Sequence, residues 1–204
     1  MTIQLHEGDL PDGVRFGASV AIDTEAMGLN PHRDRLCVVQ LSSGDGTAHL
    51  VQFRRGQYAA PRLRALLADP DTLKIFHFGR FDIALLARYL DVYARPVYCT
   101  KIAAKLTRTF TDRHGLRDLC RELLGVELSK QQQTSDWGQT MLTPEQMSYA
   151  ASDVLHLHAL KEKLDTLLVR EDRAGLAAAC FEFLPTRAAL DLHGWTDNLD
   201  VFNH

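Results

Sequence analysis

The sequence predicts an α/β fold in which a mixed sheet of five to six strands is flanked by helices and followed by a C-terminal helical segment. Three observations support this prediction. Strand-like apolar runs, separated by turn residues, fill much of the first half of the chain. A helical pattern separates the later strands, as expected of a mixed sheet flanked by helices. From Thr100 onward, apolar residues recur at spacings of three and four, as they do on helices.

Length and composition fit one domain. The chain has 204 residues, 46% of them apolar, with no apolar run of the roughly 20 residues that span a bilayer and no signal-peptide pattern at its start. A net charge of −3 disfavours binding of long nucleic acid by bulk electrostatics, but allows a short phosphate-bearing substrate held through metal ions. Four scattered cysteines without metal-ligand spacing predict reduced core thiols in a cytoplasmic protein: Cys37, Cys99, Cys120 and Cys180.

The N-terminal elements are predicted as strands. Apolar and β-branched residues favour strands over 14–23, 35–43 and 47–53. The turn residues SGDG at 43–46 make the last two a hairpin.

A helix and a second group of strands follow. The stretch PRLRALLADP predicts a helix that ends before Pro70, and LKIFHF predicts a buried strand over 73–78. Gly79 interrupts this strand, and a helix is expected over 80–90. PVYC, residues 96–99, is a further short strand.

The C-terminal half contains one predicted long helix. Thr143 is suited to cap its start, with Pro144 at the first helical position. The apolar stripe that predicts this helix consists of Met147, Ala150, Val154, Leu157, Leu160, Leu164 and Leu167.

Acidic residues occur where three of these elements begin or end. Asp23 and Glu25 are two apart at a strand end, so their side chains share a face; two solvated acids are the plainer interpretation. Asp82 lies in the first turn of a helix, where the helix dipole alone favours an acid. Tyr149 and Asp153 are four apart on a predicted helix, a spacing also common in ordinary amphipathic helices. Carboxylate pairs of this kind suit Mg²⁺ or Mn²⁺, which prefer oxygen ligands.

Taken in order, these motifs resemble a known set. DxE on an early strand, FD after a middle strand and YxxxD on a late helix resemble the three exonuclease motifs of the DEDD superfamily. The chain is similar to the tyrosine-bearing subclass, because Ser148 stands where the sister subclass has histidine. The resemblance implies a ribonuclease H-like fold.

Two later stretches narrow the resemblance. LSKQQQTSDW (128–137) and LTPEQMSYAASDVLHL (142–157) are similar to the ribonuclease D family. Ribonuclease D proper usually carries C-terminal nucleic-acid-binding domains of the HRDC type, and this sequence leaves no room for one. We therefore expect a single 3′-5′ exonuclease domain over 1–204. The stretches at 29–48, 100–116 and 179–195 are close to the nano-RNase C group of ribonuclease D-like oligoribonucleases.

The resemblance implies a reaction and a site. Members hydrolyse the 3′-terminal phosphodiester of RNA and release nucleoside 5′-monophosphates. Carried over, the motifs give Asp23, Glu25, Asp82 and Asp153 as ligands of two Mg²⁺ or Mn²⁺ ions, and Tyr149 as the group that orients the attacking water. The expected substrates are short oligoribonucleotides, chiefly diribonucleotides. The alternative is a broader ribonuclease D-like exonuclease that trims tRNA or other structured RNA, or acts on DNA.

Further residues are candidates for substrate binding. Leu29 follows the acidic motif, as in oligoribonucleases where a leucine wedges between bases, although simple packing explains it equally well. Phe78 could stack on a base or be a buried strand end, and His77 is equally ambiguous. The basic stretch 101–121 is the expected phosphate-facing surface, with a solvated helix face as the alternative. Its candidates, with one residue beyond it, are Lys101, Lys105, Arg108, His114 and Lys130.

The resemblance also implies assembly. Related proteins form rings, so a homo-octamer is expected here. The apolar and aromatic stretch CFEFLPTRAALDLHGW, residues 180–195, either covers the domain's own sheet or forms a subunit contact.

Overall fold

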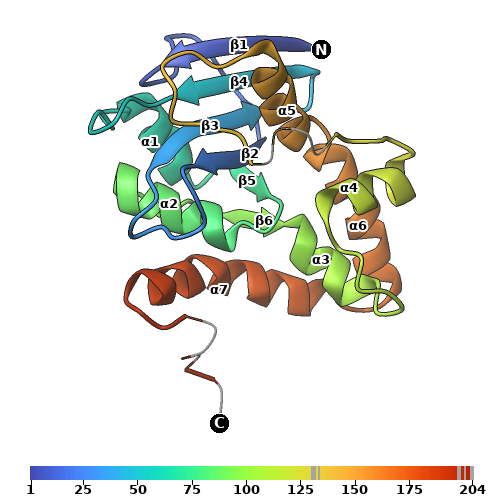
Figure 1. Cartoon of the computed structure of the whole chain (residues 1–204). Coiled ribbons are helices and arrows are strands. Elements are labelled where there is room, and N and C mark those ends of the chain that lie inside the picture. The colour runs from blue at the N-terminus through green and yellow to red at the C-terminus, as the bar shows by residue number, and fades with distance from the viewer. Residues whose placement is uncertain (130–131, 133, 197–198, 200, 203–204) are drawn as a thin grey trace.

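The computed structural model describes residues 1–129, 132, 134–196, 199 and 201–202. It contains a mixed sheet of six strands, as predicted, in the order β1-β4-β3-β2-β5-β6 (Figure 1). The strands are β1 (Thr2–Glu7), β2 (Ser19–Ala26), β3 (Leu36–Ser42), β4 (Thr47–Gln52), β5 (Leu73–Phe76) and β6 (Val97–Cys99).

The strand directions divide the sheet into two halves. Strands β2, β3 and β4 form an antiparallel meander, and Gln40 of β3 lies opposite both Asp23 and Leu50. Strands β5 and β6 then extend the sheet in parallel to β2, while β1 pairs in parallel with β4 at the opposite edge.

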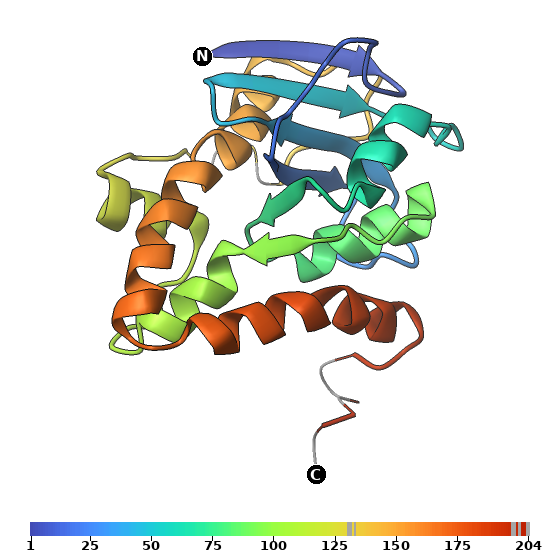
Figure 2. The ribbon, with the colours of Figure 1, turned by 180° about the vertical axis from the view of Figure 1, so that it is seen from behind.

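Helices cover both faces of the sheet (Figures 1 and 2). Helices α1 (Pro61–Ala68) and α2 (Arg80–Leu90) pack on one face, and α5 (Pro144–Leu155) packs on the other. The remaining helices enclose the β6 end of the sheet: α3 (Thr100–Thr107), α4 (Leu116–Leu119), the π-helical turn Cys120–Leu124, α6 (Leu157–Arg170) and α7 (Ala174–Leu192).

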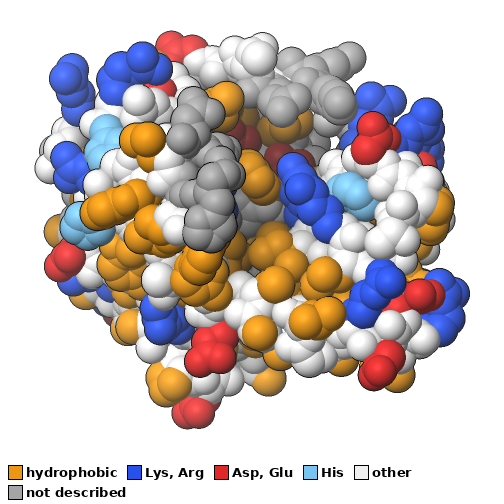
Figure 3. Space-filling view, turned by 90° about the horizontal axis from the view of Figure 1, so that it is seen from below, with side chains coloured by type: hydrophobic (Ala, Val, Ile, Leu, Met, Phe, Trp, Pro, Cys, Tyr) orange, Lys and Arg blue, Asp and Glu red, His pale blue; other side chains and the backbone are white. Residues whose placement is uncertain are grey.

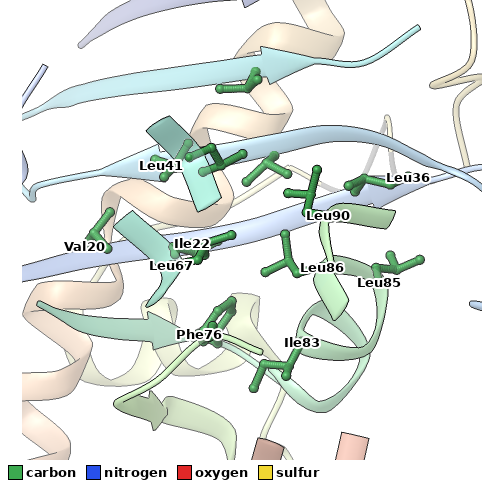
Figure 4. Packing of buried hydrophobic residues seen from close by; sticks show 14 of the residues in the cluster. Val20, Ile22, Leu36, Leu41, Leu67, Phe76, Ile83, Leu85, Leu86 and Leu90 are labelled. Carbon is green, nitrogen blue, oxygen red and sulfur yellow. The ribbon is translucent and has the colours of Figure 1, made fainter. Parts of the chain in front are cut away.

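The alternation of side chains along β2 explains this layering. Val20 and Ile22 point to the α1/α2 side and pack with Phe76 and Leu86 (Figure 4). Ala21, between them, points to the opposite side and belongs to the cluster formed with α5 and α6. Because β2 is buried on both faces, its last residues are held firmly where the acidic motif begins.

Most predicted elements are confirmed, with three differences. Strand β1 was not predicted; it is a short edge strand whose residues are all exposed or half-buried, so its hydrophobic pattern is weak. Strand β2 begins at Ser19 instead of residue 14, because Gly17 adopts φ +69° and interrupts the extended chain. The long helix predicted from Pro144 is wrong, since it is divided into α5 and α6 at His156.

Two further expectations concern the burial of the cysteines and the absence of membrane-spanning segments. Cys37, Cys99 and Cys120 are buried free thiols, as expected, but Cys180 is exposed on α7 and is not a core residue. No helix within the described part of the chain has the length and apolar character needed to cross a membrane.

Candidate active site

The acidic residues of strand β2 lie beyond the point at which its pairing with β5 ends. Strand β5 pairs with β2 only at Ser19, Val20 and Ala21, so the following residues have β3 alone as a partner. Asp23 and Glu25 lie in this part of β2, on the same face of the strand as Ala21, and a register shift follows Glu25. Both residues line a cavity.

A tight turn brings the third acid to this cavity. After β5, Phe78 adopts φ +65°, and a Cβ on Gly79 would lie 2.6 Å from the Cβ of Phe76. Only glycine fits at this position, so the chain can turn directly into α2. Asp82 then lies in the first turn of α2, where the Thr24 hydroxyl donates a 2.6 Å hydrogen bond to its Oδ1.

Helix α5 supplies the phenol and the fourth acid. A capping box formed by Thr143 and Gln146 begins this helix, with Pro144 at its first position. Tyr149 and Asp153 follow one turn apart, and the Tyr149 hydroxyl favours the charged form of the Asp153 carboxyl and lowers its pKa. The predicted YxxxD pair therefore shares one face of a helix, although that helix is shorter than expected.

The four acids and the phenol line one cavity of about 690 Å³. Carboxylate oxygens of Asp23, Glu25 and Asp153 all lie within 4.8 Å of one another. Asp82 lines the same cavity, linked to the group through Thr24. In the space-filling view, acidic side chains lie at the bottom of a hollow beside a basic side chain (Figure 3).

Burial raises the pKa of every acid in this group, and repulsion by neighbouring acids adds to the rise for Asp23, Glu25 and Asp153. Burial, followed by the charges of neighbouring acids, holds the pKa values of Asp23 and Glu25 well above their usual range. Burial also raises the pKa of Asp82 and of Asp153 to about 7, although the Thr24 and Tyr149 hydroxyls partly offset it. Burial and the charge of Asp153 raise the pKa of Tyr149, so the phenol is protonated at neutral pH.

The donor set fits hard divalent cations. Four carboxylates that converge in a buried cavity repel one another, and oxygen-ligated ions such as Mg²⁺ or Mn²⁺ remove this repulsion. These residues could therefore hold metal, with Asp23, Glu25 and Asp153 in position to share one ion.

The raised pKa values predict how the metal-free protein responds to pH. Between pH 3.8 and about 7, Asp82 binds more protons in the folded than in the unfolded chain, so its contribution to stability falls as pH rises. Asp82→Asn removes this pH-dependent loss of stability, and its amide oxygen still accepts the hydrogen bond from the Thr24 hydroxyl. We expect the variant to melt several degrees above the wild type at pH 8 in chelator, and the difference to shrink at pH 5. The rise in the pKa of Asp82 from 3.8 to about 7 corresponds to at most about 4 kcal/mol in the free energy of unfolding.

Thermal melts of both proteins in chelator test this prediction. The comparison between variant and wild type is needed because half-buried histidines with lowered pKa values, such as His6 and His49, contribute the opposite trend in both proteins. Asp112→Asn, at an exposed acid, serves as the matched control. A variant that melts below the wild type at pH 8 would contradict the repulsion inferred for the cluster.

Four of the predicted substrate-binding residues line the cavity: Leu29, His77, Phe78 and Lys101. Leu29 is 88% exposed, and Phe78 is 50% exposed, which excludes the buried strand end as an explanation of Phe78. The Lys101 ammonium lies 4.0 Å from the centre of the Phe78 ring. A 2.9 Å hydrogen bond between Nδ1 of His77 and the Thr100 hydroxyl fixes the imidazole ring.

The other basic candidates lie elsewhere. The described residues that line the cavity do not include Lys105, Arg108 or His114. Arg108 is only 3% exposed and pairs with Glu122, so it does not belong to a phosphate-facing surface of this chain. Helical spacing alone could not reveal this, because α3 ends at Thr107 and Arg108 turns inward. Lys130 lies outside the described residues.

Sequence reasoning missed several residues of the site. The Thr24 hydroxyl donates a hydrogen bond to Asp82, but in the sequence this residue is only the middle position of the DxE motif. Trp137 lines the cavity and packs on Tyr149 with ring centres 6.1 Å apart. Arg117 contributes a cation to the cavity wall and was predicted only as part of the basic stretch.

A comparison with protein families matches residues 10–169 to a family described as 3′-5′ exonuclease. Ribonuclease D of Granulibacter bethesdensis is 36% identical over 154 residues, which cover 76% of this chain and 38% of that protein. The chain thus spans about two fifths of the length of this relative.

Solved structures of similar length also match. NrnC of Brucella melitensis with bound Mg²⁺ is 56% identical, with a TM-score of 0.95 and full coverage of both chains. NrnC of the same organism bound to pGG is also 56% identical, with a TM-score of 0.96 over 100% of this chain and 99% of that chain.

Proposed function

The chain belongs to the 3′-5′ exonuclease family, and from this premise we propose that it is a metal-dependent 3′-5′ exoribonuclease. It hydrolyses the 3′-terminal phosphodiester of short oligoribonucleotides, chiefly diribonucleotides, and releases nucleoside 5′-monophosphates. The observation that carries this proposal is the convergence of Asp23, Glu25, Asp82, Asp153 and Tyr149 on one cavity, from segments far apart in the sequence. In this proposal, residues 1–204 form a single exonuclease domain.

The proposed mechanism assigns each group one task. Asp23, Glu25, Asp82 and Asp153 hold two divalent cations, Mg²⁺ or Mn²⁺, with Thr24 fixing the orientation of the Asp82 carboxylate. When bound, such ions stabilise the negative charge that develops on the reacting phosphate. The Tyr149 hydroxyl would orient the attacking water, and it would accept the proton of that water only as the phenolate, a form that the positive charge of bound cations favours by lowering the pKa of the phenol.

The size and charge of the cavity support a short substrate. Its volume of about 690 Å³ lies within the range of roughly 300–1,000 Å³ that small-molecule sites occupy. The whole chain has a net charge of −3, which disfavours long phosphate backbones. The similar NrnC of Brucella melitensis has been solved with bound pGG, which is consistent with a dinucleotide-sized site.

The cavity wall offers groups for bases and phosphates. Leu29 and Phe78 present exposed apolar side chains, suited to contact with base faces. Lys101 and Arg117 add positive charge to the lining of the cavity, and His77 lines the same cavity. Phe78 keeps its bulky ring at a backbone conformation that favours glycine, which supports a role for the ring itself.

The expected ring of subunits remains part of the proposal. Helix α7 and the residues after it expose Leu176, Phe183 and Trp195, and Phe181 packs inward on Tyr98. The stretch 180–195 therefore both covers the domain and offers apolar side chains to a second copy, as a homo-oligomer requires.

A time course on 5′-labelled RNAs of two to 20 nucleotides tests the proposed function. We expect removal from the 3′ end, a higher kcat/KM for the dinucleotide than for the 20-mer, and no turnover in chelator. The reason is that a small acidic cavity gives a long strand few additional phosphate contacts. Reactions with Mg²⁺ and with Mn²⁺ identify the effective ion.

Deoxy versions of the same oligonucleotides are the matched control. Equal kcat/KM on the dinucleotide and the 20-mer would replace the proposal with the broader ribonuclease D-like activity. Equal rates on RNA and DNA would remove the ribonucleotide preference, and turnover in chelator would reject the metal site.

A further inference from the structure

Residues 134–139 form one wall of the active-site cavity. Thr134, Ser135 and Trp137 line the cavity, while the carbonyl groups of residues 136, 138 and 139 face the body of the protein. This wall has no regular secondary structure, so its position depends on the side chains that bind it.

The Gln146 side chain is the centre of these contacts. It is 1% exposed, and its Nε2 donates to the Ser135 hydroxyl at 2.7 Å and to the Asp136 carbonyl at 3.0 Å. Its Oε1 accepts from the Thr143 backbone NH at 2.9 Å and from Gln139 Nε2 at 2.7 Å. One amide thus binds the wall through both its nitrogen and its oxygen, and the oxygen also caps α5.

Two side chains, one just before β3 and one in β4, complete the attachment. Arg35 donates from Nη2 to the Gly138 carbonyl at 2.9 Å, and Gln52 donates to the Gln139 carbonyl at 3.0 Å. A Cβ on Gly138 would lie 2.5 Å from the sulfur of Met27, so the wall approaches the β2 segment closely. Together these bonds fix residues 135–139 from both the sheet and α5.

The wall in turn contacts the proposed catalytic phenol. Trp137 is buried and its ring centre lies 6.1 Å from that of Tyr149. Gln146 and Tyr149 are three residues apart on α5, hence neighbours on its surface. A shift of the wall would therefore move the ring that packs against Tyr149.

We propose that Gln146 is a positioning residue, which holds the 134–139 wall and, through Trp137, the orientation of Tyr149. This inference rests on the proposed function only for its effect on turnover, because the contacts themselves are made between residues of this chain. Misplacement of a reacting group by about 1 Å costs roughly 10²-fold in rate, so loss of the amide donor bond to the wall backbone is sufficient for a measurable effect.

Gln146→Glu separates the two roles of the side chain. A glutamate keeps the oxygen that caps α5 but loses the donor for the Asp136 carbonyl, which it then repels. In a Trp195→Phe background, where Trp137 is the one tryptophan left, we expect red-shifted emission and stronger acrylamide quenching in metal-free protein. We also expect kcat to fall about 10–100-fold, with KM and the metal-binding midpoint within about threefold of the parent.

Thr143→Ala is the matched control, because it removes the hydroxyl of the cap and leaves the wall contacts in place. It should lower the melting temperature without changing Trp137 emission or kcat. If Gln146→Glu fails to fold, Ser135→Ala removes one wall contact outside α5 and should shift the emission and kcat in the same direction.

Two results would overturn the inference. Unchanged emission and quenching in Gln146→Glu would show that the amide does not hold the wall. A shifted emission with unchanged kcat would show that the wall does not orient Tyr149. Because emission is read without substrate, an inactive wild-type protein would reject the proposed function while the placement of the wall is still measured.

Discussion

Asp153→Asn is expected to reduce kcat by on the order of 10⁴-fold or more, with little change in fold. The substitution preserves volume but removes one of three carboxylates whose oxygens lie within 4.8 Å of one another. A neutral amide is a weaker ligand for a divalent ion, so the charge that stabilises the reacting phosphate is lost. The same change should raise the melting temperature of the metal-free protein, since it removes a buried charge and, secondarily, its repulsion with Asp82.

Single-turnover assays on a dinucleotide, with calorimetric titration of Mn²⁺, test this prediction. Glu145→Gln is the matched control, because Glu145 is an exposed acid at the start of the same helix. The control should retain turnover and metal affinity. Wild-type turnover in Asp153→Asn would remove Asp153, and with it the proposed metal site, from the mechanism.

Tyr149→Phe is expected to lower kcat by roughly 10²–10⁴-fold, the usual range for loss of general acid–base catalysis. The ring remains packed on Trp137, so only the hydroxyl is lost. Metal affinity should be retained within about tenfold, because the four carboxylates are untouched. This separation of turnover from metal binding distinguishes the phenol from Asp153.

Metal titration and the kcat of the two proteins are measured under the same conditions. Tyr93→Phe, at an exposed tyrosine after α2, is the control and should behave like the wild type. If Tyr149→Phe retained full kcat, the phenol would serve only as a structural neighbour of Asp153.

The sequence predicts the site well because its motifs are local. Asp23 and Glu25 share a face of a strand, and Tyr149 and Asp153 share a face of a helix, so each pair follows from periodicity alone. The order of the motifs then supports the family, and the whole-length similarity to NrnC of Brucella melitensis confirms that resemblance. The β-rich first half and the flanking helices follow from the same periodicities.

Contacts between distant segments could not be predicted in this way. The hydrogen bond from Thr24 to Asp82 joins residues 58 positions apart, and those of Arg35 and Gln52 to the wall span still more. The division between α5 and α6 was hidden because a one-residue turn at His156 leaves the apolar stripe nearly in phase. Arg108 was misplaced because spacing gives the face of a helix but not the residue at which the helix ends.

The spread of the acids along the chain has a consequence during protein synthesis. The proposed ligands at positions 23, 25 and 82 are translated well before Asp153, which lies on a helix that packs across strands already made. A nascent polypeptide without α5 therefore lacks one proposed metal ligand and the proposed catalytic phenol. The proposed nuclease site is assembled only when α5 packs against the sheet.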